Sequence, residues 1–271
     1  MSAAISPSRA QARSESDTST VKLENSIALI TGAASGLGHA TAHRLAAAGA
    51  KVIGIDLPVA VEQAPQTDPR IRLLAADVRD EDAVKSAVSA AADWGPLRVV
   101  VNCAGVGDPA RVVSKTGPLE LQRFQRVIDI NLVGSFNVTR LAGAAMVATN
   151  PVDGERGVII NTASVAAYDG QIGQASYAAS KGAIASMTLP LARDLSSQLI
   201  RVMGIAPGMF DTPILQGLSE PARESIASQV PHPRRLGDPH EFAALVEHIV
   251  VNPMLNGETI RLDGAIRMAP R

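Results

Sequence analysis

The sequence predicts an α/β fold in which one doubly wound parallel sheet of about seven strands is flanked by helices on both faces. The chain has 271 residues, of which 46% are hydrophobic and 19% charged. This composition is typical of a globular protein with a substantial core. Short apolar runs alternate with longer helical patterns, as βαβ units around a parallel sheet require. Because no internal repeat or linker divides the chain, we expect a single domain.

Each predicted strand is a short apolar run rich in branched residues, which is typical of a buried strand. The seven runs are, in order, IALIT from Ile27, VIGID from Val52, IRLLAAD from Ile71, RVVVNC from Arg98, GVIINTAS from Gly157, IRVMGIAP from Ile200 and TIRLDG from Thr259. Helical patterns occupy the intervals near 36–48, 81–93, 119–147, 176–195 and 239–250. The alternation predicts a Rossmann-type domain over residues 23–271.

Three segments lie outside these patterns. Residues 1–22 are rich in Ser, Ala and Arg without a periodic apolar face, which predicts a disordered extension. Glu15 and Asp17 argue against the alternative, an organelle transit peptide. Segments 106–118 and 207–235 are rich in Gly, Pro and charge and follow strands. Since ligands bind outside the carboxyl ends of such strands, we expect a substrate mouth there, with 207–235 as a loop or helical lid.

Charge and cysteine content exclude several classes of protein. Lys and Arg total 25 against 26 for Asp and Glu, which argues against a nucleic-acid partner. No apolar run is long enough for a membrane span.

The single cysteine, Cys103, excludes an intrachain disulfide and fits a reducing, cytoplasmic compartment. We interpret Cys103 as a structural residue. His39 and His43 are spaced i,i+4 without an acidic or cysteine partner nearby in sequence, so we predict no metal site.

The stretch TGAASGLG, residues 31–38, follows the first strand and opens a helix. Glycines there allow a tight turn and a close approach of the backbone to a pyrophosphate, which the helix N-terminus favours. The alternative is an ordinary turn before a helix, but the position between a strand and a helix favours a dinucleotide site. The residues predicted to form it are Gly32, Ser35, Gly36, Leu37 and Gly38.

Asp56 ends the second predicted strand, 18 residues after Gly38. An acid at this spacing binds the adenosine ribose hydroxyls and repels the 2′-phosphate of NADP. The sequence therefore predicts NAD as the cofactor, with a solvated aspartate at the strand end as the alternative.

Two later strand ends extend the predicted cofactor site. Asp77 and Val78 follow the third strand, where they could reach the adenine ring. Asn102, Ala104 and Gly105 lie at the end of the fourth, where a small, close backbone could border the nicotinamide ribose.

Tyr177 and Lys181 share one face of a predicted helix. A phenol with a pKa near about 10 is a poor base, but a nearby lysine and the positive nicotinamide would favour the phenolate. Tyr177 could then remove an alcohol proton, or return it in the reverse reaction. Ser164, at the end of the fifth strand, could hold the substrate oxygen. Asn131, inside the long helix predicted near 119–147, could bend that helix or hold a water that relays protons to Lys181. Structural roles for both residues stay open.

These motifs, together with Pro207 and Gly208, occur in the order found in the short-chain dehydrogenase/reductase family, which the sequence after residue 26 resembles. The resemblance implies that Ser164, Tyr177, Lys181 and Asn131 carry catalysis. It also implies that the cofactor is contacted by Tyr177, Lys181, Pro207, Gly208 and Thr212.

A closer likeness to one branch of this family lies in GVIINTASVAAYDGQIGQASYAASKGAIASMTLPLARDL, SQVPHPRRLGDP and LNGETIRLDGAIRMAP. It implies an NAD-dependent homotetramer that converts (S)-3-hydroxyacyl-CoA to 3-ketoacyl-CoA. A hydroxysteroid or other secondary alcohol is the alternative substrate. A non-catalytic scaffold or RNA-processing subunit is the alternative of another class, although the complete catalytic set argues against it.

Arg111 and Lys115 are two cations on a predicted mouth loop. We hypothesise that Arg111 or Lys115 contacts CoA phosphates, with an ordinary solvated loop as the alternative.

Overall fold

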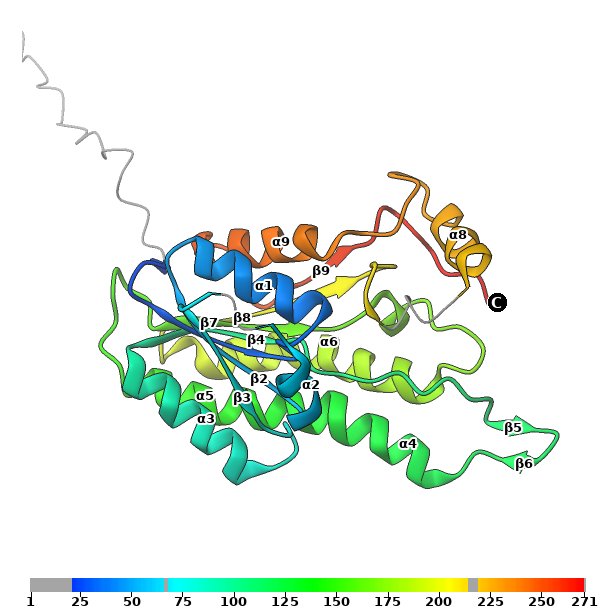
Figure 1. Ribbon diagram of the computed structural model, residues 1–271, viewed down its shortest axis with the longest axis horizontal. Coiled ribbons are helices and arrows are strands. Elements are labelled where there is room, and N and C mark those ends of the chain that lie inside the picture. Colours follow the sequence, from blue (N-terminus) through cyan, green and yellow to red (C-terminus); the bar gives the residue numbers. More distant parts are fainter. Residues whose placement is uncertain (1–20, 66–67, 214–218, 271) are drawn as a thin grey trace, which may run out of the picture.

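A seven-stranded parallel sheet forms the centre of the protein (Figure 1). The structure is a computed structural model, which describes residues 21–65, 68–213 and 219–270. The strands lie in the order β3-β2-β1-β4-β7-β8-β9. Their bounds are β1 Ile27–Thr31, β2 Lys51–Asp56, β3 Ile71–Ala75, β4 Leu97–Asn102, β7 Gly157–Thr162, β8 Ile200–Pro207 and β9 Thr259–Leu262. All seven predicted strands are confirmed. The strand order reverses between β1 and β4, which places the ligand crevice at their carboxyl ends.

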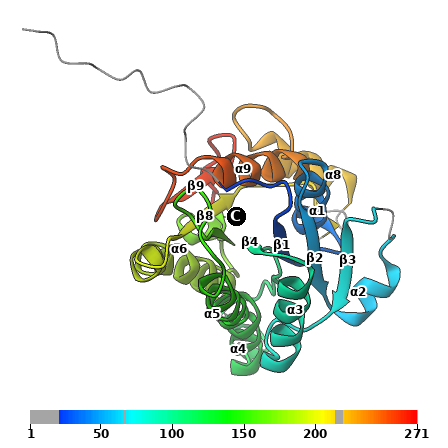
Figure 2. The same cartoon turned by 90° about the vertical axis from the view of Figure 1, so that its left-hand side faces the viewer.

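Helices cover both faces of the sheet (Figure 2). One face carries α1 (Gly36–Ala47) and α9 (Pro239–Val251), and the other carries α3 (Glu81–Trp94), α5 (Gly134–Val147) and α6 (Ala175–Ser196). Successive strand residues alternate between two cores: Ala28 and Ile30 face α1 and α9, whereas Ile27 and Leu29 face α3 and α5. Because both faces are covered, the central strands are apolar on both sides.

The long helix predicted near 119–147 is not continuous. It consists of α4 (Leu121–Ile128), a π-helical turn (Asp129–Val133) and α5. Asn131 lies in the π-helical turn and is fully buried. A π turn inside a helix inserts an extra residue and often marks a functional position.

The remaining elements are short. Helix α2 (Pro58–Gln63) follows β2, and α8 (Glu220–Ser228) lies in the predicted lid, of which residues 214–218 are outside the described part. Strands β5 (Val113–Ser114) and β6 (Gly117–Pro118) form an antiparallel hairpin that projects from the body (Figure 1). The sequence did not predict this hairpin.

The predicted N-terminal extension overlaps the packed domain at its end. Residues 1–20 lie outside the described residues, whereas Val21 and Leu23 are buried in the core. The packed domain therefore begins by Val21, two residues before the predicted boundary. Among the described residues, none of the helices combines the length and apolar character needed to cross a bilayer.

Candidate active site

The glycine turn after β1 has no room for side chains. Gly32 and Gly36 have φ values of +66° and +54°, a region that favours glycine. A Cβ atom on Gly32 would lie 2.9 Å from the backbone nitrogen of Ala104, and one on Gly38 would lie 2.1 Å from the carbonyl oxygen of Gly32. The turn, the start of α1 and the segment after β4 are therefore in backbone contact.

The N-terminus of α1 is suited to an anion. Its N-cap, Ser35, makes no side-chain capping hydrogen bond, and the first turn contains no acidic residue. The first amides of α1 are thus not capped by a side chain, and the helix dipole favours negative charge at this end. Such a cradle fits the pyrophosphate of a dinucleotide.

Asp56 holds the glycine turn against the end of β2. Its two carboxylate oxygens accept hydrogen bonds from the backbone nitrogens of Ala34, at 3.0 Å, and Leu57, at 2.8 Å. Asp56 therefore lies beside the predicted cofactor site, but each of its carboxylate oxygens already accepts one hydrogen bond from the backbone of the protein.

Asp77 and Val78 lie just beyond the end of β3. The Arg79 guanidinium, 2.6 Å from the Asp77 carboxylate, holds the pKa of Asp77 below its usual value. Val78 is buried and packs on the start of α5, where a Cβ atom on Gly134 would lie 2.5 Å from Val78 Cγ2. The structure thus assigns both side chains contacts within the protein.

Asn102 does not present its side chain to the crevice. The side chain is buried, and its Nδ2 donates to Asn161 Oδ1 at 2.8 Å and to Thr139 Oγ1 at 3.2 Å. These bonds join β4 to β7 and α5. Ala104 and Gly105, by contrast, bring backbone into the crevice, because the Cβ position of Gly105 lies 3.6 Å from Lys181 Nζ.

Asn131 connects three segments. Its Nδ2 donates to the carbonyl oxygen of Val106 and to Ser180 Oγ, both at 3.0 Å, and its Oδ1 accepts from the backbone nitrogen of Val106 at 2.8 Å. The π-helical turn, the segment after β4 and helix α6 are therefore held together by one amide.

Ser164, Tyr177 and Lys181 meet at the carboxyl edge of the sheet. Strand β7 ends at Thr162, and Ser164 is the N-cap of the short 3-10 helix Val165–Ala167 rather than a strand residue. Ser164 hydrogen-bonds to the hydroxyl of Tyr177. Lys181 Nζ lies 5.8 Å from the centre of the Tyr177 ring and donates to the Thr162 carbonyl oxygen at 2.7 Å. A phenol, a hydroxyl and an amine are thus gathered in one place, as general acid–base chemistry requires.

The electrostatics of the chain alone keep the phenol protonated. Burial raises the pKa of Tyr177, and the hydrogen bond with Ser164 offsets only part of this rise. Burial also lowers the pKa of Lys181 to about 8. Burial is therefore the dominant influence on the Tyr177 phenol in the cofactor-free protein, whereas the predicted lowering of its pKa depends on Lys181 together with the positive nicotinamide of the oxidised cofactor.

Cys103 is an unreactive neighbour of this site. Burial raises the pKa of its thiol to about 11, and Thr162 Oγ1 donates to the sulfur at 3.7 Å. These surroundings support the structural interpretation of Cys103, because the thiolate is the reactive form.

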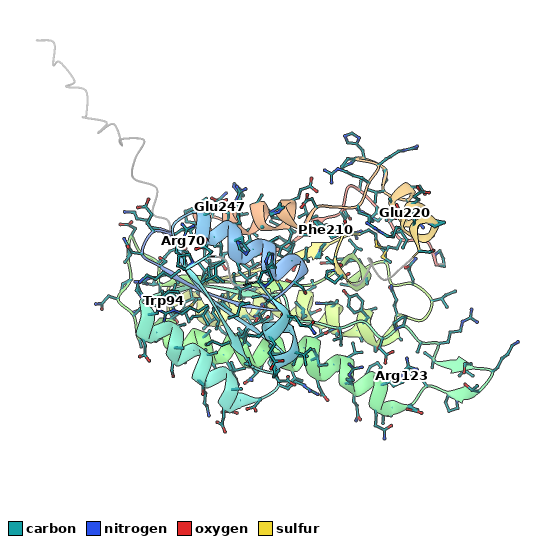
Figure 3. The ribbon with its side chains drawn as sticks, in the orientation of Figure 1. Arg70, Trp94, Arg123, Phe210, Glu220 and Glu247 are labelled. Carbon is teal, nitrogen blue, oxygen red and sulfur yellow. The ribbon has the colours of Figure 1, made fainter. Side chains whose placement is uncertain are left out.

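The walls of the crevice come from distant segments. Gly208 is in close contact with Asp263, and Thr212 packs over the glycine turn, where the Cβ position of Gly36 lies 3.6 Å from Thr212 Cγ2. At the base of the β5–β6 hairpin, Arg123 is hydrogen-bonded to Asp108 (Figure 3). Arg111 and Lys115 are exposed on that hairpin segment.

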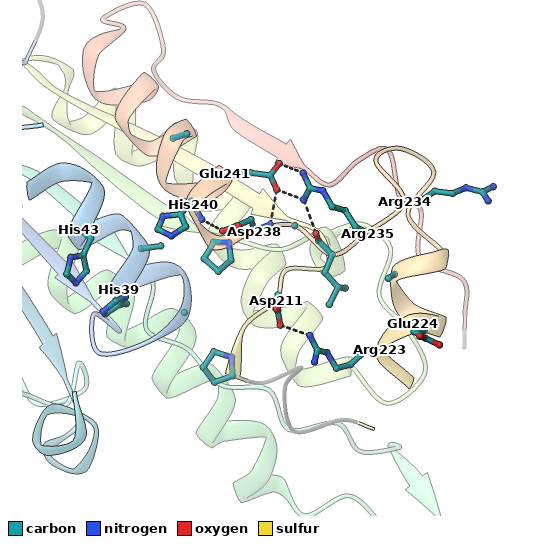
Figure 4. Close-up of a pocket in the computed structure, with 18 of the residues that line it drawn as sticks. His39, His43, Asp211, Arg223, Glu224, Arg234, Arg235, Asp238, His240 and Glu241 are labelled. Carbon is teal, nitrogen blue, oxygen red and sulfur yellow. Dashed lines mark hydrogen bonds and ion pairs between the residues drawn. The ribbon is translucent and has the colours of Figure 1, made fainter. Parts of the chain in front are cut away.

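A hollow of about 1060 Å³ lies between α1, α8 and α9 (Figure 4). Its lining includes Gly36 of the glycine turn but none of Ser164, Tyr177 and Lys181. The rings of His39 and His43 are 4.4 Å apart on its α1 side, and burial, then His43 and His240, lower the pKa of His39. Ion pairs of Arg223 and Arg235 lie on the other side. The described residues contain no group of three or more His, Cys, Asp or Glu arranged to hold a metal. Sequence spacing did not reveal this hollow, because its lining is brought together only by the fold.

Comparisons with known proteins agree with this geometry. A model of the short chain dehydrogenase family matches residues 26–223. The chain is 52% identical to the 3-hydroxyacyl-CoA dehydrogenase type-2 of Drosophila melanogaster, over 92% of the chain and 100% of that relative. It is 53% identical to the Homo sapiens protein of the same name, over 90% of the chain and 96% of the relative. The crystal structure of 3-hydroxyacyl-CoA dehydrogenase type-2 from Mycobacterium avium matches with a TM-score of 0.85 and 40% identity, covering 91% of this chain and 98% of that one.

Proposed function

The chain belongs to the short-chain dehydrogenase family of oxidoreductases, and from that premise we propose that it transfers hydride between NAD(H) and a secondary alcohol or ketone. We further propose (S)-3-hydroxyacyl-CoA and 3-ketoacyl-CoA as the substrate pair. The meeting of Ser164, Tyr177 and Lys181 beside the glycine turn carries the reaction class. The substrate class rests on relatives named 3-hydroxyacyl-CoA dehydrogenase type-2 that share half of the residues over nine tenths of the chain.

The residues fit NAD because the backbone at Gly32 and Gly38 leaves no room for a Cβ atom and the turn leads into a helix N-terminus without a side-chain cap. When bound, NAD supplies the acceptor for hydride. In the proposal, the glycine turn holds the pyrophosphate and Asp56 the adenosine ribose. Asp77 and Val78 border the adenine. The nicotinamide half is held by Asn102, Ala104, Gly105, Tyr177, Lys181, Pro207, Gly208 and Thr212, with Asn102 acting through its backbone because its side chain is engaged elsewhere.

Tyr177 is the proposed acid and base. Its phenol is protonated at neutral pH, as a group that donates a proton to a ketone oxygen must be. In the oxidation direction, the positive charge of the oxidised cofactor would favour the phenolate that takes the alcohol proton. Ser164, already hydrogen-bonded to Tyr177, is placed to hold the substrate oxygen beside the phenol.

Lys181 and Asn131 complete the proposed catalytic set. Lys181, held by the Thr162 carbonyl, would bind the nicotinamide ribose and contribute charge near the phenol. The Asn131 side chain acts by holding the surrounding segments, because its amide is engaged by Val106 and Ser180. Because this amide is already hydrogen-bonded, a water that relays protons to Lys181 would have to lie beside Asn131 and not be held by its Nδ2.

The same proposal includes a homotetramer in the cytoplasm, with small molecules as the partners. Sedimentation analysis of the purified chain tests the assembly, since a monomer and a tetramer differ fourfold in mass. Imaging of a tagged chain in cells tests the compartment.

The decisive experiment compares NADH formation from NAD with (S)-3-hydroxybutyryl-CoA, its (R) enantiomer and a 17β-hydroxysteroid. We expect the highest kcat/KM for the (S) thioester, lower activity with NADP and loss of activity in Tyr177→Phe. A higher kcat/KM for the steroid would transfer the assignment to a hydroxysteroid dehydrogenase. NAD binding without turnover of any secondary alcohol would support the scaffold alternative and refute catalysis.

A further inference from the structure

The loop at 168–174 joins the two halves of the proposed catalytic site. It lies between the 3-10 helix that begins after Ser164 and helix α6, which carries Tyr177. A loop of this kind lacks the backbone ladder of a helix or strand, so its position depends on other contacts. The contacts in this structure converge from three segments that are distant in sequence.

Arg261, on β9, makes the strongest of these contacts. Its Nη2 donates to Asp169 Oδ2 at 2.6 Å and to the Ile266 carbonyl oxygen at 3.0 Å, and its Nε donates to Asp263 Oδ2 at 2.8 Å. The guanidinium carbon lies 5.3 Å from the centre of the Tyr168 ring, within cation–π range. One planar side chain thus holds two consecutive residues of the loop, Tyr168 and Asp169.

These charges are largely shielded from water. The exposed fractions of the side chains are 22% for Arg261, 18% for Asp169 and 8% for Asp263. Forked, partly buried guanidinium–carboxylate pairs are more rigid than exposed pairs and lose more when one partner is removed. The pair is ionised near neutral pH, because hydrogen bonding to Arg261 lowers the pKa of Asp169.

The C-terminal tail is tied to the same loop. Gln171 Nε2 donates to the carbonyl oxygen of Ala269, and the backbone nitrogen of Ile172 donates to that of Pro270, both at 3.0 Å. Arg267 pairs with Asp263 at 3.1 Å, so the acid that holds Arg261 also holds the tail. The third contact comes from the segment after β4, where the Ala110 nitrogen donates to the Gly173 carbonyl oxygen at 2.8 Å.

We propose that Arg261 is a positioning residue, which acts through Asp169 to hold Ser164 and Tyr177 in reacting geometry and joins them to the C-terminal tail. This inference rests on the proposed dehydrogenase function. Arg261 touches neither of the proposed reacting groups, and its effect is transmitted through the 168–174 loop. A misplacement of about 1 Å in reacting groups costs about 100-fold in rate, so a loosened loop lowers turnover even when the fold persists.

Variants of the pair test the kinetic consequence. Arg261→Met and Asp169→Asn should each lower kcat by about 10- to 100-fold, with the KM for NAD nearly unchanged. Arg261→Lys should be intermediate, since an ammonium can reach Asp169 but cannot form the same fork. Arg44→Met is the matched control, because Arg44 on α1 pairs with Glu247 on α9 and has no part in the contacts of the loop. Its kcat should equal that of the unaltered protein.

A second readout needs no substrate. The chain has only two tyrosines, so in a Tyr168→Phe background the alkaline change in tyrosinate absorbance reports Tyr177 alone. Burial holds the pKa of Tyr177 above its ordinary value. Adding Arg261→Met should admit water and move that pKa downward, whereas adding Arg44→Met should not.

The two readouts separate the possible outcomes. An unchanged kcat and an unchanged Tyr177 titration in Arg261→Met, with only a lower melting temperature, would overturn the proposal and leave Arg261 a purely structural residue. If the unaltered protein oxidises no secondary alcohol, the proposed function fails. The tyrosinate titration would still show whether Arg261 positions Tyr177.

Discussion

The side chain of Asn131 donates a 3.0 Å hydrogen bond to the hydroxyl of Ser180. This bond links the π-helical turn to α6 at the residue before Lys181. The same amide makes two bonds to the backbone of Val106. One buried side chain thus sets the distance between the segment after β4 and the helix that carries the proposed acid and base.

Asn131→Ala is expected to destabilise the fold by about 1–3 kcal/mol, because it leaves the partly buried backbone N–H and C=O groups of Val106 without their partner. Urea unfolding measures this loss. Ser180→Ala removes only the bond to α6 and retains both bonds to Val106, so its loss should be smaller. An equal loss in both variants would contradict the central role of the Val106 contacts.

Lys181 is expected to make the stability of the cofactor-free protein depend on alkaline pH. Burial lowers its pKa from 10.5 to about 8. Between these values the unfolded chain binds more protons than the folded one, so the contribution of Lys181 to the free energy of unfolding rises with pH. The rise should approach about 3 kcal/mol, at about 1.4 kcal/mol for each pKa unit.

Denaturant titrations of the unaltered protein and Lys181→Met across this pH window measure the effect. The free energy of unfolding of the unaltered protein should increase relative to that of the variant as the pH rises. A constant difference between the two proteins would show that the Lys181 pKa is not lowered.

Gly38→Ala should abolish NAD binding and destabilise the domain, because its methyl group would lie 2.1 Å from the Gly32 carbonyl oxygen. Gly143→Ala is the matched control within helix α5, where the nearest atom to the new methyl is Ile159 Cδ1 at 3.9 Å. Replacing a helical glycine by alanine in free space stabilises by about 0.5–1 kcal/mol. Calorimetric NAD titration and thermal unfolding distinguish the two variants, and normal NAD affinity in Gly38→Ala would rule out the predicted backbone approach.

Cys103 should resist alkylation in the folded protein. A thiol pKa of about 11 instead of 9.0 reduces the thiolate fraction at neutral pH by about 100-fold, and the side chain is only partly accessible. Iodoacetamide labelling followed by mass spectrometry, in buffer and in urea, measures the difference. Equal labelling rates in both conditions would disprove the shielding.

Much of the fold and part of the site were predictable because their signals are local. Apolar runs of strand length identified all seven strands of the sheet. The glycine turn was recognisable because a strand, three glycines and a helix follow one another directly. Tyr177 and Lys181 share a helix face because four residues make about one turn, and both lie on α6 as predicted.

Other features were hidden because they depend on partners far away in sequence. The backbone of Asn102 was predicted to border the cofactor, and the sequence did not reveal that its side-chain amide bonds to Asn161 on the neighbouring strand. Asn131 was placed in a continuous helix, yet it lies in a π-helical turn whose geometry accompanies bonds to Val106 and Ser180. Arg261 and Asp169 are 92 residues apart, and no spacing rule joins them.

Local sequence was sufficient to establish the parallel sheet, the turn suited to a dinucleotide and the shared face of Tyr177 and Lys181, since periodicity and spacing define the faces of single elements. Tertiary packing alone decided which groups hydrogen-bond to Tyr177 and Lys181 and how burial shifts their pKa values. Desolvation around Tyr177 raises the pKa of its phenol, and spacing along a helix does not reveal this burial. Burial and hydrogen bonding depend on every segment that surrounds a side chain, and those segments become neighbours only when the chain is folded.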